Sequence, residues 1–214
     1  MWCAARDKFG RDGAFLSWVK PPTPIADGLR VGLLGGSFDP AHEGHLYVSD
    51  VARKALNLDQ VWWLVTPGNP LKPTPVSVEL RVARARLVAR APYITVTGIE
   101  AALHTRYTID TVTELQHRFA GLHFTWLMGT DNLEQFSRWR HWRELAARIP
   151  IAVVRRPGSV LAPLRAPLAR LLGLSRQIGP APSLVVLDGR RNPQSSTALR
   201  GLGDVDAAML NTTL

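Results

Sequence analysis

The sequence contains a single cysteine, Cys3, so it cannot form a disulfide within the chain. It also lacks an apolar run of the roughly 20 residues that a membrane-spanning helix requires. Charged residues are scattered through residues 1–24, without the apolar stretch of a secretory signal. These absences favour a cytoplasmic protein that is neither secreted nor embedded in a membrane.

Acidic residues are outnumbered: 17 aspartates and glutamates stand against 26 lysines and arginines, giving a net charge of +9 and a pI near 10.7. The basic residues form no dense run, so a polybasic tail is not expected. The charge balance favours an anionic partner, such as a phosphorylated small molecule, lipid headgroups or a nucleic acid. A generally arginine-rich composition without functional meaning is the alternative.

The length of 214 residues fits one domain with an embellishment. Residues 1–29 end in a proline-rich stretch, and we expect them to form a partly disordered N-terminal extension. Residues 30–214 are predicted to form the functional domain.

Short apolar runs alternate with amphipathic segments through this domain. Strands are predicted at 30–36, 61–67, 93–98, 123–129, 151–158 and 183–189. Helices are predicted at 44–56, 78–91 and 108–119, with a loop and one short helix over 159–182. This alternation predicts an α/β fold, a Rossmann-like doubly wound parallel sheet with helices on both faces. In the helix at 78–91, we expect Leu80, Ala83 and Leu87 to face the core and the arginines to face solvent.

The stretch LGGSFDPAHEGHL, residues 34–46, combines features of a phosphate site. Gly35 and Gly36 allow a sharp turn and a close approach of the backbone to a ligand. His42 and His45 share one face of the helix that follows, and the N–H groups at a helix start attract anions. Zinc binding is disfavoured because the metalloprotease pattern needs histidines four apart. We therefore expect no metal site built from protein side chains.

A second candidate anion site lies far downstream in NPQSSTALRGLG. Ser195 and Ser196 are good helix caps, and Arg200 follows one turn later. Hydroxyls and a guanidinium at a helix start would bind the outer phosphates of a nucleotide. A plain capped helix is the alternative.

Together, GGSFDPAHEGH and SSTALR resemble the signatures of the nucleotidyltransferase superfamily with the HxGH motif. The resemblance implies that His42 and His45 are catalytic, contacting ATP phosphates and stabilising the α-phosphate during transfer. The ATP-binding residues that it implies are Gly35, Gly36, Ser37, Phe38, His42, His45, Ser195, Ser196 and Arg200. Mg²⁺ is the expected cofactor, bound mainly through ATP phosphates because no carboxylate cage is visible.

The stretches TPGNPLK, TRYTIDTVTEL and LMGTDNLEQFSRWRHW resemble those of bacterial nicotinate-mononucleotide adenylyltransferases, over residues 30–202. This resemblance implies transfer of the adenylyl group of ATP to nicotinate mononucleotide, giving deamido-NAD and pyrophosphate in NAD biosynthesis. The implied mononucleotide-binding residues are Lys72, Tyr107, Thr108, Asp131 and Trp139. An indole can stack on the pyridine ring, and backbone N–H groups at a helix start can bind the nicotinate carboxylate.

Two other functions stay open at this point. One is a sister enzyme of the same fold, such as a pantetheine-phosphate adenylyltransferase or a cytidylyltransferase. The other is a non-catalytic nucleotide- or RNA-binding module, because residues 137–143 mix aromatics with arginines. We interpret those arginines as a solvated helix face and do not expect nucleic acid as a partner. Trp62 and Trp63 are interpreted as core residues. The remaining histidines are interpreted as structural or surface residues: His104, His117, His123 and His141.

Overall fold

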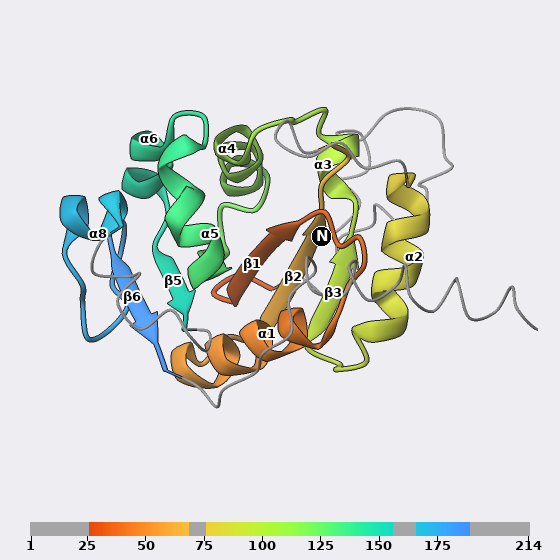
Figure 1. Ribbon diagram of the computed structural model, residues 1–214, viewed down its shortest axis with the longest axis horizontal. Coiled ribbons are helices and arrows are strands. Elements are labelled where there is room, and N and C mark those ends of the chain that lie inside the picture. The colour runs from red at the N-terminus through yellow and green to blue at the C-terminus, as the bar shows by residue number, and fades with distance from the viewer. Residues whose placement is uncertain (1–25, 69–75, 156–165, 189–214) are drawn as a thin grey trace, which may run out of the picture.

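A computed structural model describes residues 26–68, 76–155 and 166–188. In this part of the chain six parallel strands form one sheet with the order β3-β2-β1-β4-β5-β6 (Figure 1). The strands are β1 (Arg30–Gly36), β2 (Gln60–Val65), β3 (Ile94–Thr97), β4 (His123–Gly129), β5 (Ile151–Val154) and β6 (Leu184–Leu187). All six lie within or overlap the predicted strands, and the predicted fold class is confirmed.

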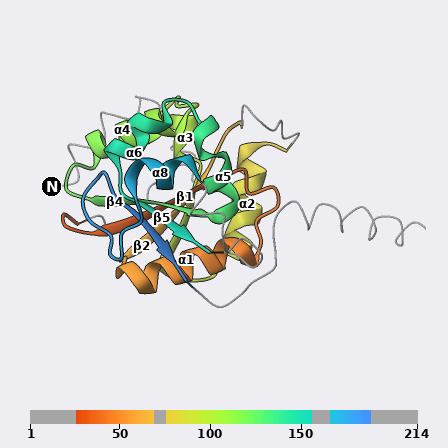
Figure 2. The same cartoon turned by 60° about the vertical axis from the view of Figure 1, so that its left-hand side comes forward.

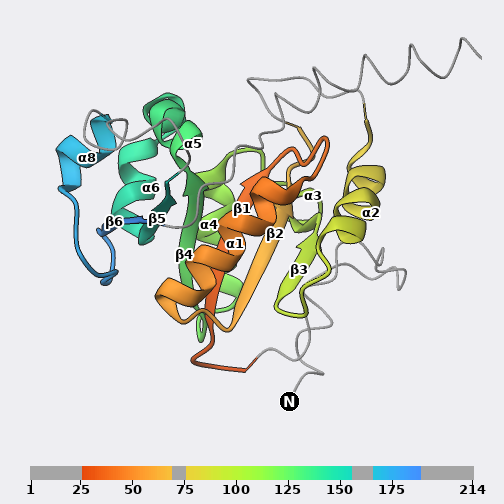
Figure 3. The same cartoon turned by 60° about the horizontal axis from the view of Figure 1, so that its bottom comes forward.

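Helices cover both faces of the sheet and divide its core into two layers. On one face lie α1 (Glu43–Leu56) and α2 (Val78–Val88). On the other face lie α3 (Ile99–Ala102), α4 (Thr108–Arg118), α5 (Thr130–Gln135), the 3₁₀ helix η2 (Phe136–Arg138), α6 (Trp142–Arg148) and α8 (Pro167–Leu172). Figure 2 shows α1 beneath the sheet and the second group above it, and Figure 3 shows α1 lying over the strands of the sheet.

The strands are apolar on both sides because both faces are covered. Trp62 and Trp63 are adjacent on β2, so their side chains point to opposite faces, and each is completely buried in a different core layer. Both were predicted to be core residues, and that prediction is confirmed. In the described part of the chain, no helix is both long enough and apolar enough to cross a membrane.

The strand order creates a switch point beside β1. The chain passes from β1 to β2 and β3 on one side, then returns to β4, β5 and β6 on the other. Ligands of open parallel sheets bind beyond the carboxyl ends of the strands at such a point. Gly36 and Gly129 end β1 and β4 there. The segments with predicted chemistry therefore begin at the edge where this fold binds its ligands.

The predicted orientation of α2 is wrong. Leu80 and Leu87 are 46% and 71% exposed, whereas Arg81 is 1% exposed and packs inward with Val82 and Ala85. Apolar residues occur on every side of this helix, so their spacing does not fix which side is buried. Arg81 lies inside because backbone carbonyl groups at the sheet edge accept its hydrogen bonds.

Several helix boundaries also differ from the expectation. The cap of α4 is Tyr107, so Thr108 is its first helical residue rather than its cap. Three of the helices that were not predicted, α3, α5 and α6, have four to seven residues each. Such segments are too short for a clear amphipathic period. A short helix was expected within 159–182, and in the described part of that segment, residues 166–182, α8 is such a helix.

We expect Gly35→Ala to destabilise the fold, because a Cβ there would lie 2.6 Å from Cη2 of Trp126 on the neighbouring strand. The buried indole cannot move aside cheaply, and overpacking of this kind costs about 1–3 kcal/mol. Urea unfolding would measure the loss. Gly68→Ala is the control, since nothing lies within 4 Å of a Cβ at that position. Equal stability of the two variants would contradict the prediction.

Candidate active site

Two histidines cap the start of α1. The Nδ1 atom of His42, the N-cap residue, accepts a hydrogen bond from the Gly44 N–H at 3.0 Å. The Nδ1 atom of His45 reaches back to accept from the His42 N–H at 3.2 Å. This is a capping box in which imidazoles replace the usual hydroxyl and carboxylate. The pair thereby satisfies backbone donors that a helix start otherwise leaves without partners.

The caps also determine where each imidazole carries its proton. A nitrogen that accepts a hydrogen bond has no proton, so each neutral ring is protonated on Nε2. The two ring centroids lie 4.0 Å apart, and His42 is 5% exposed while His45 is half-buried. Two Nε2–H donors therefore stand side by side at the positive end of a 14-residue helix. This arrangement suits a phosphate anion.

Two aromatic rings, those of Phe38 and Trp63, pack against the His45 ring. The His45 ring lies 4.6 Å from Phe38 and 5.7 Å from Trp63, and those two rings stack at 5.1 Å. The Trp63 Nε1–H donates to the Ser49 hydroxyl, which donates to the His45 carbonyl, both at 2.8 Å. The His45 ring is thus held by contacts from β2, from its own helix and from the turn after β1.

Gly35 and Gly36 end β1, and the turn that follows from Ser37 places the Phe38 ring against His45. Phe38 has a φ of 48°, in the left-handed region that a bulky residue rarely adopts. Its ring is nevertheless buried against His45 and Trp63. Among the predicted ATP-binding residues, ring contacts join Phe38, His42 and His45, while Gly35, Gly36 and Ser37 lie in the strand end and the turn that lead to them. Ser195, Ser196 and Arg200 lie outside the described residues.

Three of the predicted mononucleotide-binding residues, Tyr107, Thr108 and Asp131, lie at the starts of α4 and α5, two helices of the other face of the sheet. Tyr107 and Thr108 begin α4, and no side chain among the described residues caps that helix. The Arg140 guanidinium lies 4.7 Å over the Tyr107 ring. The segment after α5 is thereby linked to the start of α4.

Trp139 is half-buried and follows η2. It packs edge-on against Trp126 at 5.9 Å and tilts over Phe136 at 5.1 Å. Asp131 is exposed in the first turn of α5, directly beyond the carboxyl end of β4. Both residues therefore stay candidates for the mononucleotide site, while Lys72 lies outside the described residues.

The four remaining histidines are exposed: His104, His117, His123 and His141. Within residues 26–68, 76–155 and 166–188, no group of three or more His, Cys, Asp or Glu residues has the arrangement of a metal site.

Two buried charged residues near the site were missed in the sequence. Arg81 contacts the turn before α1. Glu100, 7% exposed, lies in α3 beyond β3, and its Oε1 accepts a hydrogen bond from the Thr111 hydroxyl at 3.0 Å. That hydroxyl also lies 2.9 Å from the Thr105 hydroxyl and 3.3 Å from the Tyr107 carbonyl. Glu100 therefore belongs to the network that orders the start of α4.

Burial raises the pKa of Glu100 to about 7, and hydrogen bonds from Thr111 and Thr66 oppose that rise only in part. Nothing in the local sequence GIEAAL distinguishes this glutamate from a surface residue. Its partners come from α4 and from the residue after β2, so only the folded chain reveals its position.

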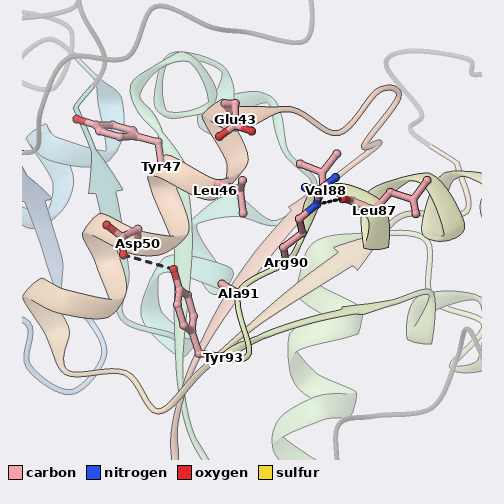
Figure 4. A pocket seen from close by; sticks show the side chains of 9 residues that line it. All are labelled: Glu43, Leu46, Tyr47, Asp50, Leu87, Val88, Arg90, Ala91 and Tyr93. Atoms are coloured by element: carbon pink, nitrogen blue, oxygen red, sulfur yellow. Dashed lines mark hydrogen bonds between the residues drawn. The ribbon is translucent and has the colours of Figure 1, made fainter.

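A pocket of about 600 Å³ lies beside α1, outside the predicted site (Figure 4). Its lining residues come from α1, from the end of α2 and from the segment after α2: Glu43, Leu46, Tyr47, Asp50, Leu87, Val88, Arg90, Ala91 and Tyr93. Tyr93 and Arg90 donate hydrogen bonds to Asp50 and to the Leu87 carbonyl within the pocket wall. None of the predicted site residues lines it.

Comparison with known proteins was made at the level of sequence and of structure. Residues 33–202 match the model of the Cytidylyltransferase-like family. A protein of Parvibaculum lavamentivorans with the name "Probable nicotinate-nucleotide adenylyltransferase" is 47% identical over 190 residues, which are 84% of this chain and 94% of that protein. A protein of the same name from Methylorubrum extorquens is 48% identical, with coverage of 80% and 99%.

The fold has solved counterparts. The structure of the Plasmodium falciparum nicotinic acid mononucleotide adenylyltransferase complexed with NaAD aligns with a TM-score of 0.63. The alignment covers 81% of this chain and 83% of the other at 14% sequence identity. At that identity the likeness concerns the fold.

The raised pKa of Glu100 predicts a pH-dependent stability. The folded protein holds a proton on Glu100 up to about pH 7, whereas the unfolded chain releases it near the ordinary value of 4.5. Folding therefore becomes less favourable as pH rises through this window. Glu100→Gln removes the titration, so the variant should gain up to about 3 kcal/mol relative to the unsubstituted protein between pH 5 and pH 8. Urea unfolding of both proteins across this range measures the difference. Parallel stability profiles would refute the assignment.

Proposed function

The chain belongs to the nicotinate-nucleotide adenylyltransferases of the Cytidylyltransferase-like family, and we propose that its site transfers the adenylyl group of ATP to nicotinate mononucleotide. The products are deamido-NAD and pyrophosphate, and the reaction is a step of NAD biosynthesis. The proposed location is the cytoplasm. The resemblance noted in GGSFDPAHEGH and in the middle of the chain is thereby confirmed at the level of the family.

The capped histidine pair is the observation that carries the proposed mechanism. Each Nδ1 accepts a hydrogen bond from a backbone N–H, so each neutral ring carries its proton, and hence its donor, on Nε2. As the transfer proceeds, negative charge develops on the oxygens around the α-phosphorus. Donors that the helix already holds in position stabilise this charge without reorganising during the reaction.

The chemistry needs little else from the protein. A phosphate oxygen of the mononucleotide attacks the α-phosphorus of ATP, the bond from that phosphorus to the bridging oxygen breaks, and pyrophosphate leaves with the electron pair. The nucleophile is already an anion near neutral pH, so no general base is required. Catalysis then consists of positioning two anions and stabilising the charge between them.

The outer phosphates of ATP are assigned to Ser195, Ser196 and Arg200, in keeping with the family resemblance of their segment. Mg²⁺ is proposed to enter with ATP, bound by phosphate oxygens and water, and to offset phosphate charge. The first turn of α1 adds the positive end of its helix dipole beside the histidines.

The acceptor is assigned to the other side of the switch point. The uncapped start of α4 at Tyr107 and Thr108 offers backbone N–H groups to the nicotinate carboxylate. The half-buried Trp139 offers a flat face to the pyridine ring. Asp131 and Lys72 complete the proposed mononucleotide site.

We expect His42→Asn and His45→Gln to fold normally and to lose turnover. Both replacements keep a side-chain acceptor at the capping position, because Asn is a good N-cap and Gln serves at the third helical position. Neither supplies an imidazole donor, so kcat should fall about 100- to 1,000-fold. Pyrophosphate release measures kcat, and thermal unfolding checks the fold. The variant His117→Ala is the control, because His117 is exposed and is not a predicted site residue. Turnover within about threefold of the unsubstituted protein would exclude a catalytic role.

A substrate screen separates this enzyme from its rivals. Product should form with ATP and nicotinate mononucleotide and not with phosphopantetheine, which the sister enzyme would accept. A binding module would release no pyrophosphate with either acceptor. Equal use of the acid and amide mononucleotides would contradict the proposed role of the α4 helix start.

Trp139→Ala should raise KM for nicotinate mononucleotide about 2- to 12-fold, because aromatic stacking on a ring contributes about 0.5–1.5 kcal/mol. KM for ATP should change little. Trp142→Ala is a matched control, since Trp142 is also half-buried and packs against Phe136. Equal effects of the two substitutions on the mononucleotide KM would show that Trp139 acts only in packing.

A further inference from the structure

Arg81 is the single buried arginine in the described part of the chain. It lies in the first turn of α2, a position where a charged side chain would ordinarily point to solvent. Burying a guanidinium is costly unless its donors are satisfied. The identity of its partners therefore shows what this burial achieves.

Each nitrogen of Arg81 donates to a different backbone carbonyl. Nη1 donates to the Ser37 oxygen at 2.6 Å, Nε to the Val76 oxygen at 3.0 Å and Nη2 to the Pro67 oxygen at 3.4 Å. Ser37 lies in the turn between β1 and α1, Pro67 follows β2, and Val76 precedes α2. The planar guanidinium of one side chain thus joins three segments at the carboxyl edge of the sheet. A lysine ammonium is a compact charge without this fork of donors, so it would join them less well.

The bond to Ser37 orients the turn that precedes the histidines. In a trans peptide the carbonyl and the next N–H point in opposite directions, and the Ser37–Phe38 bond is not among the cis bonds of the described residues. With the Ser37 carbonyl turned toward Arg81, the Phe38 N–H points away from it. The same contact supports the left-handed backbone of Phe38, whose ring packs against His45.

Neighbouring carboxylates favour the charged form of this guanidinium. Burial lowers the pKa of Arg81, and the negative charges of Asp39 and Glu79 oppose that effect. Asp39 belongs to the same turn as Ser37. Arg81 therefore interacts with the turn through both a hydrogen bond and charge attraction.

We propose that Arg81 is a positioning residue for ATP, which fixes the Ser37–Phe38 peptide so that the turn directs its N–H toward the phosphates and keeps Phe38 against His45. This inference rests on the proposed function of the turn as part of the ATP site. Arg81 itself contacts the turn through the Ser37 carbonyl and does not contact the substrate.

The test compares Arg81→Met and Arg81→Lys with Arg86→Met. Arg86 lies on the same helix and donates to the Val96 carbonyl at 3.3 Å, but it is exposed and remote from the turn. Calorimetric titration with a non-hydrolysable ATP analogue gives Kd, steady-state assays give kcat and both KM values, and thermal unfolding gives Tm.

We expect Arg81→Met to raise Kd for the analogue, and to lower kcat/KM for ATP, by about 10- to 100-fold, the equivalent of losing a hydrogen bond to a charged group. KM for the mononucleotide should stay within about threefold, and Arg86→Met should leave all constants within that range. Arg81→Lys keeps the charge without the fork and should give a smaller loss with a Tm close to that of the unsubstituted protein. It also serves as the test if Arg81→Met does not fold.

Two results would overturn the inference. One is an unchanged analogue Kd in a folded Arg81 variant, with only Tm lowered. The other is an equal loss for ATP and for the mononucleotide, which would indicate general distortion. The proposed function fails separately, if the unsubstituted protein binds the analogue but forms no dinucleotide. In that case the analogue titrations of the variants still decide the role of Arg81.

Discussion

The reciprocal cap between His42 and His45 is the interaction on which the site depends. The two nitrogens of each ring have different roles. Nδ1 accepts a hydrogen bond from a backbone N–H at the start of α1, and Nε2 remains the protonated nitrogen that can donate to a phosphate. Because the caps hold the rings, little conformational freedom would be lost when a phosphate binds. The aromatic support of Phe38 and Trp63 restricts the His45 ring further. Local folding and transition-state stabilisation are therefore properties of one short segment.

The sheet determines which segments meet this cap. The change of direction beside β1 brings the turn after β1 and the start of α5 to one edge, although they are about 95 residues apart in the chain. The histidines and their turn belong to the α1 face, whereas Tyr107, Thr108 and Trp139 belong to the opposite one. The dinucleotide product has two nucleotide halves, and the carboxyl edge of the sheet offers one group of residues from each face to bind them.

Local patterns in the sequence predicted the parallel sheet, the long helices and the histidine pair, because strand runs, helix periods and the HEGH spacing are each contained within a few residues. They did not predict the inward position of Arg81 or Glu100. The partners of Arg81 include Ser37, 44 residues away, and those of Glu100 include Thr111 in another helix. A buried charge is identified by what surrounds it, and those neighbours are set by the tertiary fold. The short helices α3, α5 and α6 were not predicted, because one or two turns are too few to show an amphipathic period.

The outward leucines of α2 follow from the same buried guanidinium. Turning α2 about its axis would bury Leu80 and Leu87 in place of Val82 and Ala85, a gain in apolar area, and yet the observed setting leaves both leucines in water. Arg81 thus determines which side of α2 faces the core, although burial of the leucines would favour the opposite side. A sequence with another leucine in place of Arg81 would have two competing helix orientations with similar packing. The turn before α1, the end of β2 and the start of α2 would then lose the side chain that joins them.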